Sequence, residues 1–122
     1  MSFTYLAAPY SHPLPAVREL RYAQTNAFAA RLMMQGEPVF SPISQSHEIA
    51  RYMGERFIMD HDFWMNMDLP MLAKARRMWV LCLDGWEDSR GVQAEMKFAA
   101  SAGIPIFLVH PSTASHVVGP VL

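Results

Sequence analysis

The sequence predicts an α/β fold, a Rossmann-like three-layer sandwich with a parallel sheet of four strands, or five, flanked by helices. Two observations lead to this prediction. Short apolar segments alternate with longer segments of helical pattern along the chain, and such alternation implies right-handed crossovers and a parallel sheet. The chain has 122 residues and no internal repeat, so we expect one domain over residues 1–122.

The N-terminal part is expected to supply a strand and a long helix. Residues 3–8 form an apolar strand, and residues 9–14 form a turn. The helix runs from Pro15, a favourable first-turn residue, to Gln35, and Gly36 ends it. We expect the stripe that faces the sheet to consist of Ala16, Leu20, Ala23, Ala27, Ala30 and Met34.

The middle of the chain contains a second strand, a loop and a second helix. Residues 38–41 are the strand, and residues 42–54 are loop-like with a helical turn at residues 48–52. Residues 58–75 are apolar nearly all round, which indicates a helix buried on two sides, against the sheet and against a second subunit.

Three acidic residues and a proline mark that second helix. Asp60 and Asp62 suit the positive end of the helix dipole near its start. Pro70 is expected to break or kink the helix, and Asp68 could cap a new turn there.

The C-terminal part is expected to contain two more strands around a helix. Residues 76–83 are the third strand and residues 84–88 the loop after it. The helix begins at Ser89 as its cap and ends at Gly103. Residues 104–109 are the fourth strand, and the last twelve residues show only a weak pattern.

Composition excludes several classes of partner. The net charge is −1 and there is no basic run, so a nucleic-acid polymer is not an expected partner. No apolar run approaches the ~20 residues that span a bilayer. The single Cys82 permits no internal disulfide and fits a reducing cytoplasm, and the N-terminus lacks the pattern of a signal peptide. Hydrophobic residues make up 52% and charged residues 17%, which favours a homodimer or higher oligomer.

Three loops are expected to leave the carboxyl ends of the strands, at residues 9–14, 42–47 and 85–90. Ligands bind at that edge in open parallel sheets. His12 and His47 lie on two of these loops and could contact a phosphate or a base, although loop histidines are more often only solvated. Trp86 could stack on a base or simply pack in its loop. No metal-ligand spacing is present, so we expect neither a metal nor an organic cofactor.

Glu95 is the residue most suggestive of chemistry. It lies on the edge of the apolar stripe of its helix, and a carboxylate carried toward the interior is costly unless a partner satisfies it. Asp68 could form a carboxyl pair with it in which the two groups take different roles. Tyr5, in the first strand, could donate to the buried carboxylate. Each has a plainer alternative: a glutamate that reaches water, a helix cap, and ordinary packing.

Ser89 and the amides of Gly91 and Val92 form a helix N-terminus, which suits an anion or a sugar hydroxyl. A plain serine cap is the competing interpretation.

Several of these segments together resemble the nucleoside 2-deoxyribosyltransferase superfamily, in particular its short bacterial and phage branch. The segments are residues 5–12 (YLAAPYSH), 40–43 (FSPI), 68–69 (DL), 85–95 (GWEDSRGVQAE) and 103–105 (GIP). The resemblance implies that Glu95 is a nucleophile oriented by Tyr5, and that Asp68 contacts the base or ribose and assists proton transfer. It also implies a dimer or higher oligomer.

The residue six positions before the proposed nucleophile refines the implied activity. The transferases carry aspartate there, whereas relatives that hydrolyse nucleoside 5′-monophosphates carry serine, as this chain does at Ser89. Those hydrolases also carry an arginine in the first loop, where this chain has His12 nearby. The resemblance therefore implies an N-glycosidase for a (deoxy)nucleoside 5′-monophosphate or nucleoside.

The implied binding roles complete this picture. The 5′ end would be held by Ser89, Gly91, Val92, Ser11 and His12, and the base would meet His47 and Trp86. A (deoxy)ribosyltransferase that exchanges bases and a nucleotide-binding sensor without turnover are the alternatives.

Overall fold

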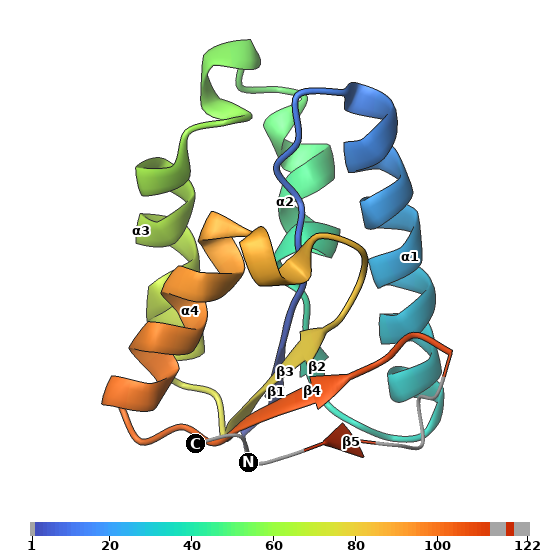
Figure 1. Ribbon diagram of the computed structural model, residues 1–122, viewed down its shortest axis with the longest axis vertical. Helices are drawn as coiled ribbons and strands as arrows, with labels where there is room; N and C mark the ends of the chain where they lie inside the picture. The colour runs from blue at the N-terminus through green and yellow to red at the C-terminus, as the bar shows by residue number, and fades with distance from the viewer. Residues whose placement is uncertain (1, 113–116, 119–122) are drawn as a thin grey trace.

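The computed structural model describes residues 2–112 and 117–118, and its strands and helices alternate as the sequence pattern requires (Figure 1). The strands are β1 (Thr4–Ala7), β2 (Val39–Phe40), β3 (Arg77–Leu81), β4 (Ile106–Val109) and β5 (Val117–Val118). The helices are α1 (Pro15–Met34), α2 (Pro42–Ala50), α3 (His61–Leu72) and α4 (Arg90–Ser101), with short 3₁₀ turns η1 (Glu55–Phe57) and η2 (Trp86–Asp88).

The sheet has the order β2-β1-β3-β4-β5. β1, β2, β3 and β4 pair in parallel, whereas β5 pairs antiparallel with β4. The predicted α/β sandwich with a four-stranded parallel core is confirmed. The antiparallel edge strand falls in the last twelve residues, where the sequence pattern is too weak to indicate it, and residues 113–116 and 119–122 of that tail lie outside the described part of the chain.

Helices cover both faces of the sheet (Figure 1). On one face, α3 and α4 pack over Tyr5, Met78, Val80 and Ile106, together with Leu72, Val92 and Ala99 from the helices themselves. On the other face, α1 packs through Phe28, Ala29 and Leu32 over Leu6, Trp79 and Leu81. Side chains alternate between the two faces along each strand, so Tyr5 points toward α4 while its neighbour Leu6 points toward α1.

The predicted core stripe of α1 is wrong. Leu20 is 57% exposed and Met34 is 80% exposed, and the four alanines of that stripe are exposed as well. The helix instead buries Thr25, Phe28, Ala29 and Leu32, a set with the same helical spacing on another face. Burying the phenylalanine and leucine removes more apolar area from water than burying alanines.

The segment expected to be a loop at residues 42–54 is largely helical, because α2 occupies Pro42–Ala50. Its start carries two ordinary signals: Ser41 accepts a hydrogen bond from the Ser44 amide, and Pro42 occupies the first turn. His47 therefore lies on a helix and not on a loop.

α3 is shorter than predicted and is not broken at Pro70. Asp60 caps it by accepting from the Phe63 amide at 3.0 Å, and the helix ends at Leu72, two residues beyond the proline. A proline this close to a helix end removes little hydrogen bonding. Asp68 lies inside the helix and caps nothing, and Leu72 is the buried residue of α3 in this chain.

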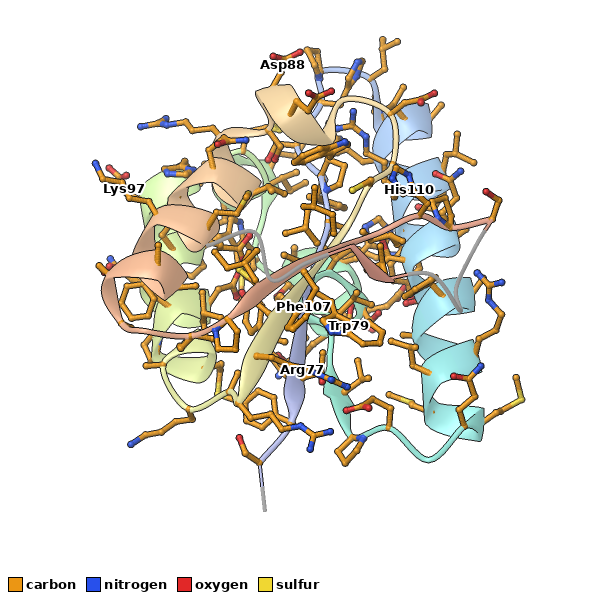
Figure 2. All side chains as sticks on the ribbon, turned by 60° about the horizontal axis from the view of Figure 1, so that its bottom comes forward. Arg77, Trp79, Asp88, Lys97, Phe107 and His110 are labelled. Atoms are coloured by element: carbon orange, nitrogen blue, oxygen red, sulfur yellow. The ribbon has the colours of Figure 1, made fainter. Side chains whose placement is uncertain are left out.

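The amino ends of the strands are closed by a polar network. Glu37 accepts hydrogen bonds from Thr4, Arg76 and Arg77, at 2.8, 2.6 and 2.7 Å. The Arg77 guanidinium also lies over the ring of Trp79, 4.7 Å from its centroid (Figure 2). The carboxyl ends, where the loops diverge, carry the pocket described below.

No helix in the described part of the chain is both long and apolar enough to cross a bilayer.

Candidate active site

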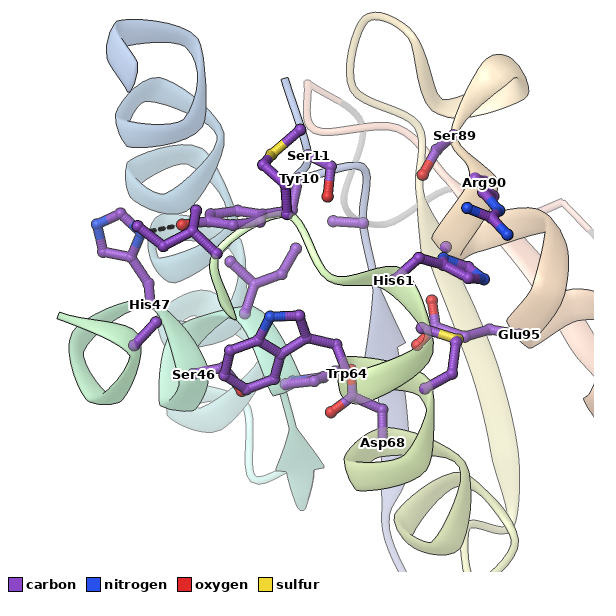
Figure 3. Close-up of a pocket in the computed structure, with 18 of the residues that line it drawn as sticks. Tyr10, Ser11, Ser46, His47, His61, Trp64, Asp68, Ser89, Arg90 and Glu95 are labelled. Carbon is purple, nitrogen blue, oxygen red and sulfur yellow. Dashed lines mark hydrogen bonds between the residues drawn. The ribbon is translucent and has the colours of Figure 1, made fainter. Parts of the chain in front are cut away.

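A pocket of about 370 Å³ opens at the carboxyl ends of the strands (Figure 3). Its size falls in the range of ~300–1,000 Å³ that is usual for small-molecule sites. The loop after β1, helix α2, the start of α3 and the start of α4 all contribute to the wall. The lining residues are Ala8, Tyr10, Ser11, Pro42, Ile43, Ser46, His47, Ala50, Ile58, Met59, His61, Trp64, Met65, Asp68, Asp88, Ser89, Arg90, Gly91 and Glu95.

Glu95 lies at the inner wall of this pocket. Its position in α4, three residues after buried Val92 and four before buried Ala99, carries it inward, and it is only 5% exposed. The phenol of Tyr5 donates a hydrogen bond to Oε2, as the sequence led us to expect. Oε1 has no hydrogen-bond partner within residues 2–112 and 117–118. Burial raises the pKa of Glu95 to about 8, against the lowering effect of the Tyr5 hydrogen bond.

Asp68 is the second carboxyl group of the pocket. It projects from α3, which packs against α4, and Figure 3 shows it on the same side of the pocket as Glu95. Burial raises the pKa of Asp68 to about 6. Its negative charge in turn contributes to the raised pKa of both Glu95 and Tyr5.

Glu95 and Asp68 therefore form an interacting pair with unlike proton affinities. Between about pH 6 and about pH 8 the two groups share one proton, and that proton belongs to the pair as a whole. The pocket then holds one carboxylate and one carboxylic acid at neutral pH. That combination supplies a nucleophile or base beside a proton donor.

Ser89 lines the pocket and also caps α4, because its Oγ accepts from the Val92 amide at 3.2 Å. This contact corrects the expectation for Val92: its amide is occupied by Ser89, and its side chain is fully buried in the core. Gly91 does line the pocket. The serine hydroxyl can still donate its proton to a ligand while its oxygen accepts from the helix.

The other predicted binding residues divide into two groups. Ser11 and His47 line the pocket, whereas His12 and Trp86 do not. Nδ1 of His12 accepts from the Leu14 amide at 3.0 Å, which holds the ring against the turn. Trp86 packs against the core on the α3 and α4 side of the sheet. Trp86 therefore follows its plainer interpretation, packing, whereas His12 is half-buried and bonded to its own turn and is not simply solvated.

Five lining residues were not named as candidates from the sequence: Tyr10, Ser46, His61, Trp64 and Arg90. Tyr10, Ser46 and Arg90 lie in the three segments expected at the ligand-binding edge, whereas His61 and Trp64 lie outside them. Ser46 could have been found by recognising Ser41 and Pro42 as the start of a helix, since α2 turns it toward the pocket. His61 follows the Asp60 cap directly, so a correct start for α3 would have indicated it. Trp64 reads as one more apolar residue of an apolar helix, and no sequence signal distinguishes it.

No group of three or more His, Cys, Asp or Glu side chains with the geometry of a metal site occurs within residues 2–112 and 117–118.

The chain was compared with solved structures, with curated proteins and with protein-family models. Among solved structures, the chain is similar to one from a study of the 2-deoxyribosyltransferase of the psychrotolerant bacterium Bacillus psychrosaccharolyticus. The TM-score is 0.58 at 20% sequence identity, with 90% of this chain and 73% of that chain covered. At that identity the likeness concerns the fold. A search of curated proteins finds no significant match.

The family comparison is made on sequence and covers most of the chain. Residues 2–111 match the model described as "Domain of unknown function (DUF1937)". The matched range includes Tyr5, Asp68, Ser89 and Glu95, so the whole pocket lies within it. The chain therefore belongs to the DUF1937 family.

Proposed function

We propose that this protein is an N-glycosidase that cleaves the base–sugar bond of a nucleoside or a nucleoside 5′-monophosphate, with Glu95 as the nucleophile. The main support for the proposal is the environment of the Glu95 carboxyl group. It is buried, its Oε2 is held by Tyr5, and it lines a pocket shared with a second carboxyl group. A buried carboxyl group with a perturbed pKa in a cleft is typical of a catalytic group.

The proposed reaction proceeds in two displacements. In the reactive form the proton that the pair shares lies on Asp68. The ionised Glu95 attacks C1′ of the sugar through an oxocarbenium-like transition state, the C1′–N bond breaks, and the base leaves with that proton or with one from water. Water then hydrolyses the glycosyl ester and returns the carboxylate. If a second base attacks the ester instead of water, the same intermediate gives base exchange, which makes the transferase reaction a variant of one mechanism.

The positions of the remaining groups support this assignment. Tyr5 favours the ionised form of Glu95 by donating to it. Ser89, Gly91 and Ser11 line the pocket and would hold the 5′ end of the substrate. The similarity in fold to a 2-deoxyribosyltransferase supports a nucleoside as the class of substrate.

The test is release of free base from a panel of nucleosides and 5′-monophosphates, followed by chromatography. We expect the unmodified protein to release base from at least one member and the Glu95→Gln variant to lose at least about 10³-fold in rate, the scale of removing a nucleophile. Near-native release by that variant would refute Glu95 as the nucleophile. Tight binding without release from any member would instead indicate a sensor of nucleotides.

A further inference from the structure

A second polar cluster lies at the wall of the pocket formed by α2 and the loop after β1, away from Glu95 (Figure 3). The Tyr10 hydroxyl is 2.6 Å from Nδ1 of His47, and Nε2 of His47 is 2.8 Å from Oε2 of Glu19. The His47 ring also stacks on Tyr22, with centroids 4.0 Å apart. The proposed glycosidase chemistry uses none of these residues.

The chemistry of Glu19, His47 and Tyr10 determines which group donates in each of the two hydrogen bonds. A carboxylate can only accept, so Glu19 requires the proton of His47 on Nε2. In the neutral ring Nδ1 then carries a lone pair and accepts the Tyr10 proton. Burial raises the pKa of Tyr10, with Glu19 adding to the rise and the charge and hydrogen bonding of Arg18 opposing it, so the phenol keeps a proton to donate. The phenol oxygen has two lone pairs, and one of them stays available beside Arg18. What Tyr10 can offer a ligand is therefore an acceptor.

We propose that Tyr10 is a specificity-determining residue that selects nucleobases carrying an exocyclic amino group over their keto counterparts. The inference rests on the proposed function, because it takes the ligand to be a nucleoside. With C1′ at Glu95 and the 5′ end at Ser89 and Gly91, the base extends toward α2, where Tyr10 and His47 line the pocket. An amino group donates to the phenol oxygen, whereas a keto oxygen would face another acceptor.

Ser46 lines the same part of the pocket, and its hydroxyl has no hydrogen-bond partner within residues 2–112 and 117–118. A serine hydroxyl both donates and accepts, so it can bind either kind of base. Ser46 therefore adds affinity without selection, and it serves as a comparison for Tyr10.

Glu19 acts through His47 and is a positioning residue. It does not line the pocket, and its side chain is 67% exposed. Removing its charge permits His47 to carry its proton on Nδ1, which turns the bond to Tyr10 around and frees the phenol proton for the ligand. The preference for amino bases then weakens even though no pocket residue has changed.

The experiment measures binding by calorimetry in the Glu95→Gln background, so that turnover does not enter. The probes are two matched pairs, 2′-deoxyadenosine with 2′-deoxyinosine and 2′-deoxycytidine with 2′-deoxyuridine, at pH 7.5. We expect the amino member of at least one pair to bind about tenfold more tightly, which is ~1.4 kcal/mol. Adding Tyr10→Phe should reduce that ratio to below threefold, and so should adding Glu19→Gln.

Two further variants separate selection from general damage. Ser46→Ala should weaken both members of a pair alike, and Glu48→Gln, an exposed change on α2, should alter neither affinity. Equal binding of amino and keto members, or a ratio that survives Tyr10→Phe, overturns the inference while leaving the proposed function intact. Absence of binding by all four probes, together with absence of base release by the unmodified protein, refutes both.

Discussion

The phenol of Tyr5 in β1 donates a hydrogen bond to the carboxyl group of Glu95 in α4, across 90 positions of sequence. Both residues are buried, and Asp68 of α3 lies close enough to raise the pKa of each. A strand and two helices thus meet at one acidic group that faces a pocket.

The pH dependence of base release should be bell-shaped. The reaction needs one ionised and one protonated group in the Glu95 and Asp68 pair, whose pKa values are about 8 and about 6. The value of kcat/KM should therefore rise with pH through about 6 and fall above about 8. Initial rates with the best substrate over pH 5–9.5 measure this. A rate that rises to a plateau and never falls would show that no proton donor is required.

The Glu95→Gln variant should be more stable than the unmodified protein at alkaline pH. The folded-state pKa of Glu95 is raised from an ordinary 4.5 to about 8, so the native state holds a proton that the unfolded chain releases. Stability is therefore lost as pH rises from about 4.5 to about 8. Glutamine carries no charge and can still accept from Tyr5.

Urea unfolding at pH 5 and pH 8.5 checks this prediction. We expect the two proteins to agree within about 1 kcal/mol at pH 5, and the variant to gain roughly 2–5 kcal/mol at pH 8.5. Glu55→Gln, a change at an exposed glutamate in η1, is the control and should show no such dependence. Equal stabilities at both pH values would mean that Glu95 ionises in the folded state as it does in water.

Tyr5→Phe should lower the rate and move the pH profile. The change removes the hydrogen bond that lowers the pKa of Glu95, so the upper pKa of the pair rises and the falling limb of the profile shifts to higher pH. Loss of one hydrogen bond to a charged group is worth about 1.5–3 kcal/mol, which corresponds to a rate about 10- to 100-fold lower. A lower rate with an unmoved profile would indicate that Tyr5 only packs.

Ser89→Ala should discriminate between substrates with and without a phosphate. Loss of a charge-assisted hydrogen bond predicts a KM for the 5′-monophosphate about 10- to 100-fold higher, with the nucleoside little affected. Loss of the cap of α4 should also cost about 1 kcal/mol of stability.

Ser41→Ala is the matched control for Ser89→Ala. Ser41 caps α2 by the same kind of contact and does not line the pocket. Its loss should therefore change the KM for the monophosphate and the KM for the nucleoside by the same factor. If Ser89→Ala also changes the two KM values by the same factor, Ser89 is only a helix cap.

The chain should form at least a dimer. On α3, Met67 is 51% exposed and Met71 is 38% exposed. Large apolar side chains that lie together on the surface of one helix are typical of an interface between subunits. Light scattering at micromolar concentration should give at least twice the 13.8 kDa of one chain. Met67→Lys combined with Met71→Lys should shift the equilibrium toward the monomer. A monomer of the unmodified protein would contradict the prediction.

Local sequence patterns predicted the structure correctly where the side chains that look apolar in sequence are also the ones that the fold buries. The alternation of apolar and helical segments predicts the parallel core, and the cap at Ser89 predicts the start of α4. The position of Glu95 beside Val92 and Ala99 on α4 predicts a buried carboxyl group. Local patterns failed at α1, where two apolar stripes compete, and at residues 42–50, whose polar composition concealed a helix.

Sequence patterns were enough to predict the four parallel strands, the helices α1, α3 and α4 between them, and the chemical groups available to the site, because hydrophobic periodicity and capping depend on near neighbours in the chain. Which of those groups come into contact depends on how the helices dock. Asp68 became a pocket residue because α3, which carries it, packs on α4. His47 met Tyr10 and Glu19 because α2 packs beside α1. Contacts of that kind depend on the docking of whole helices, which no local pattern specifies.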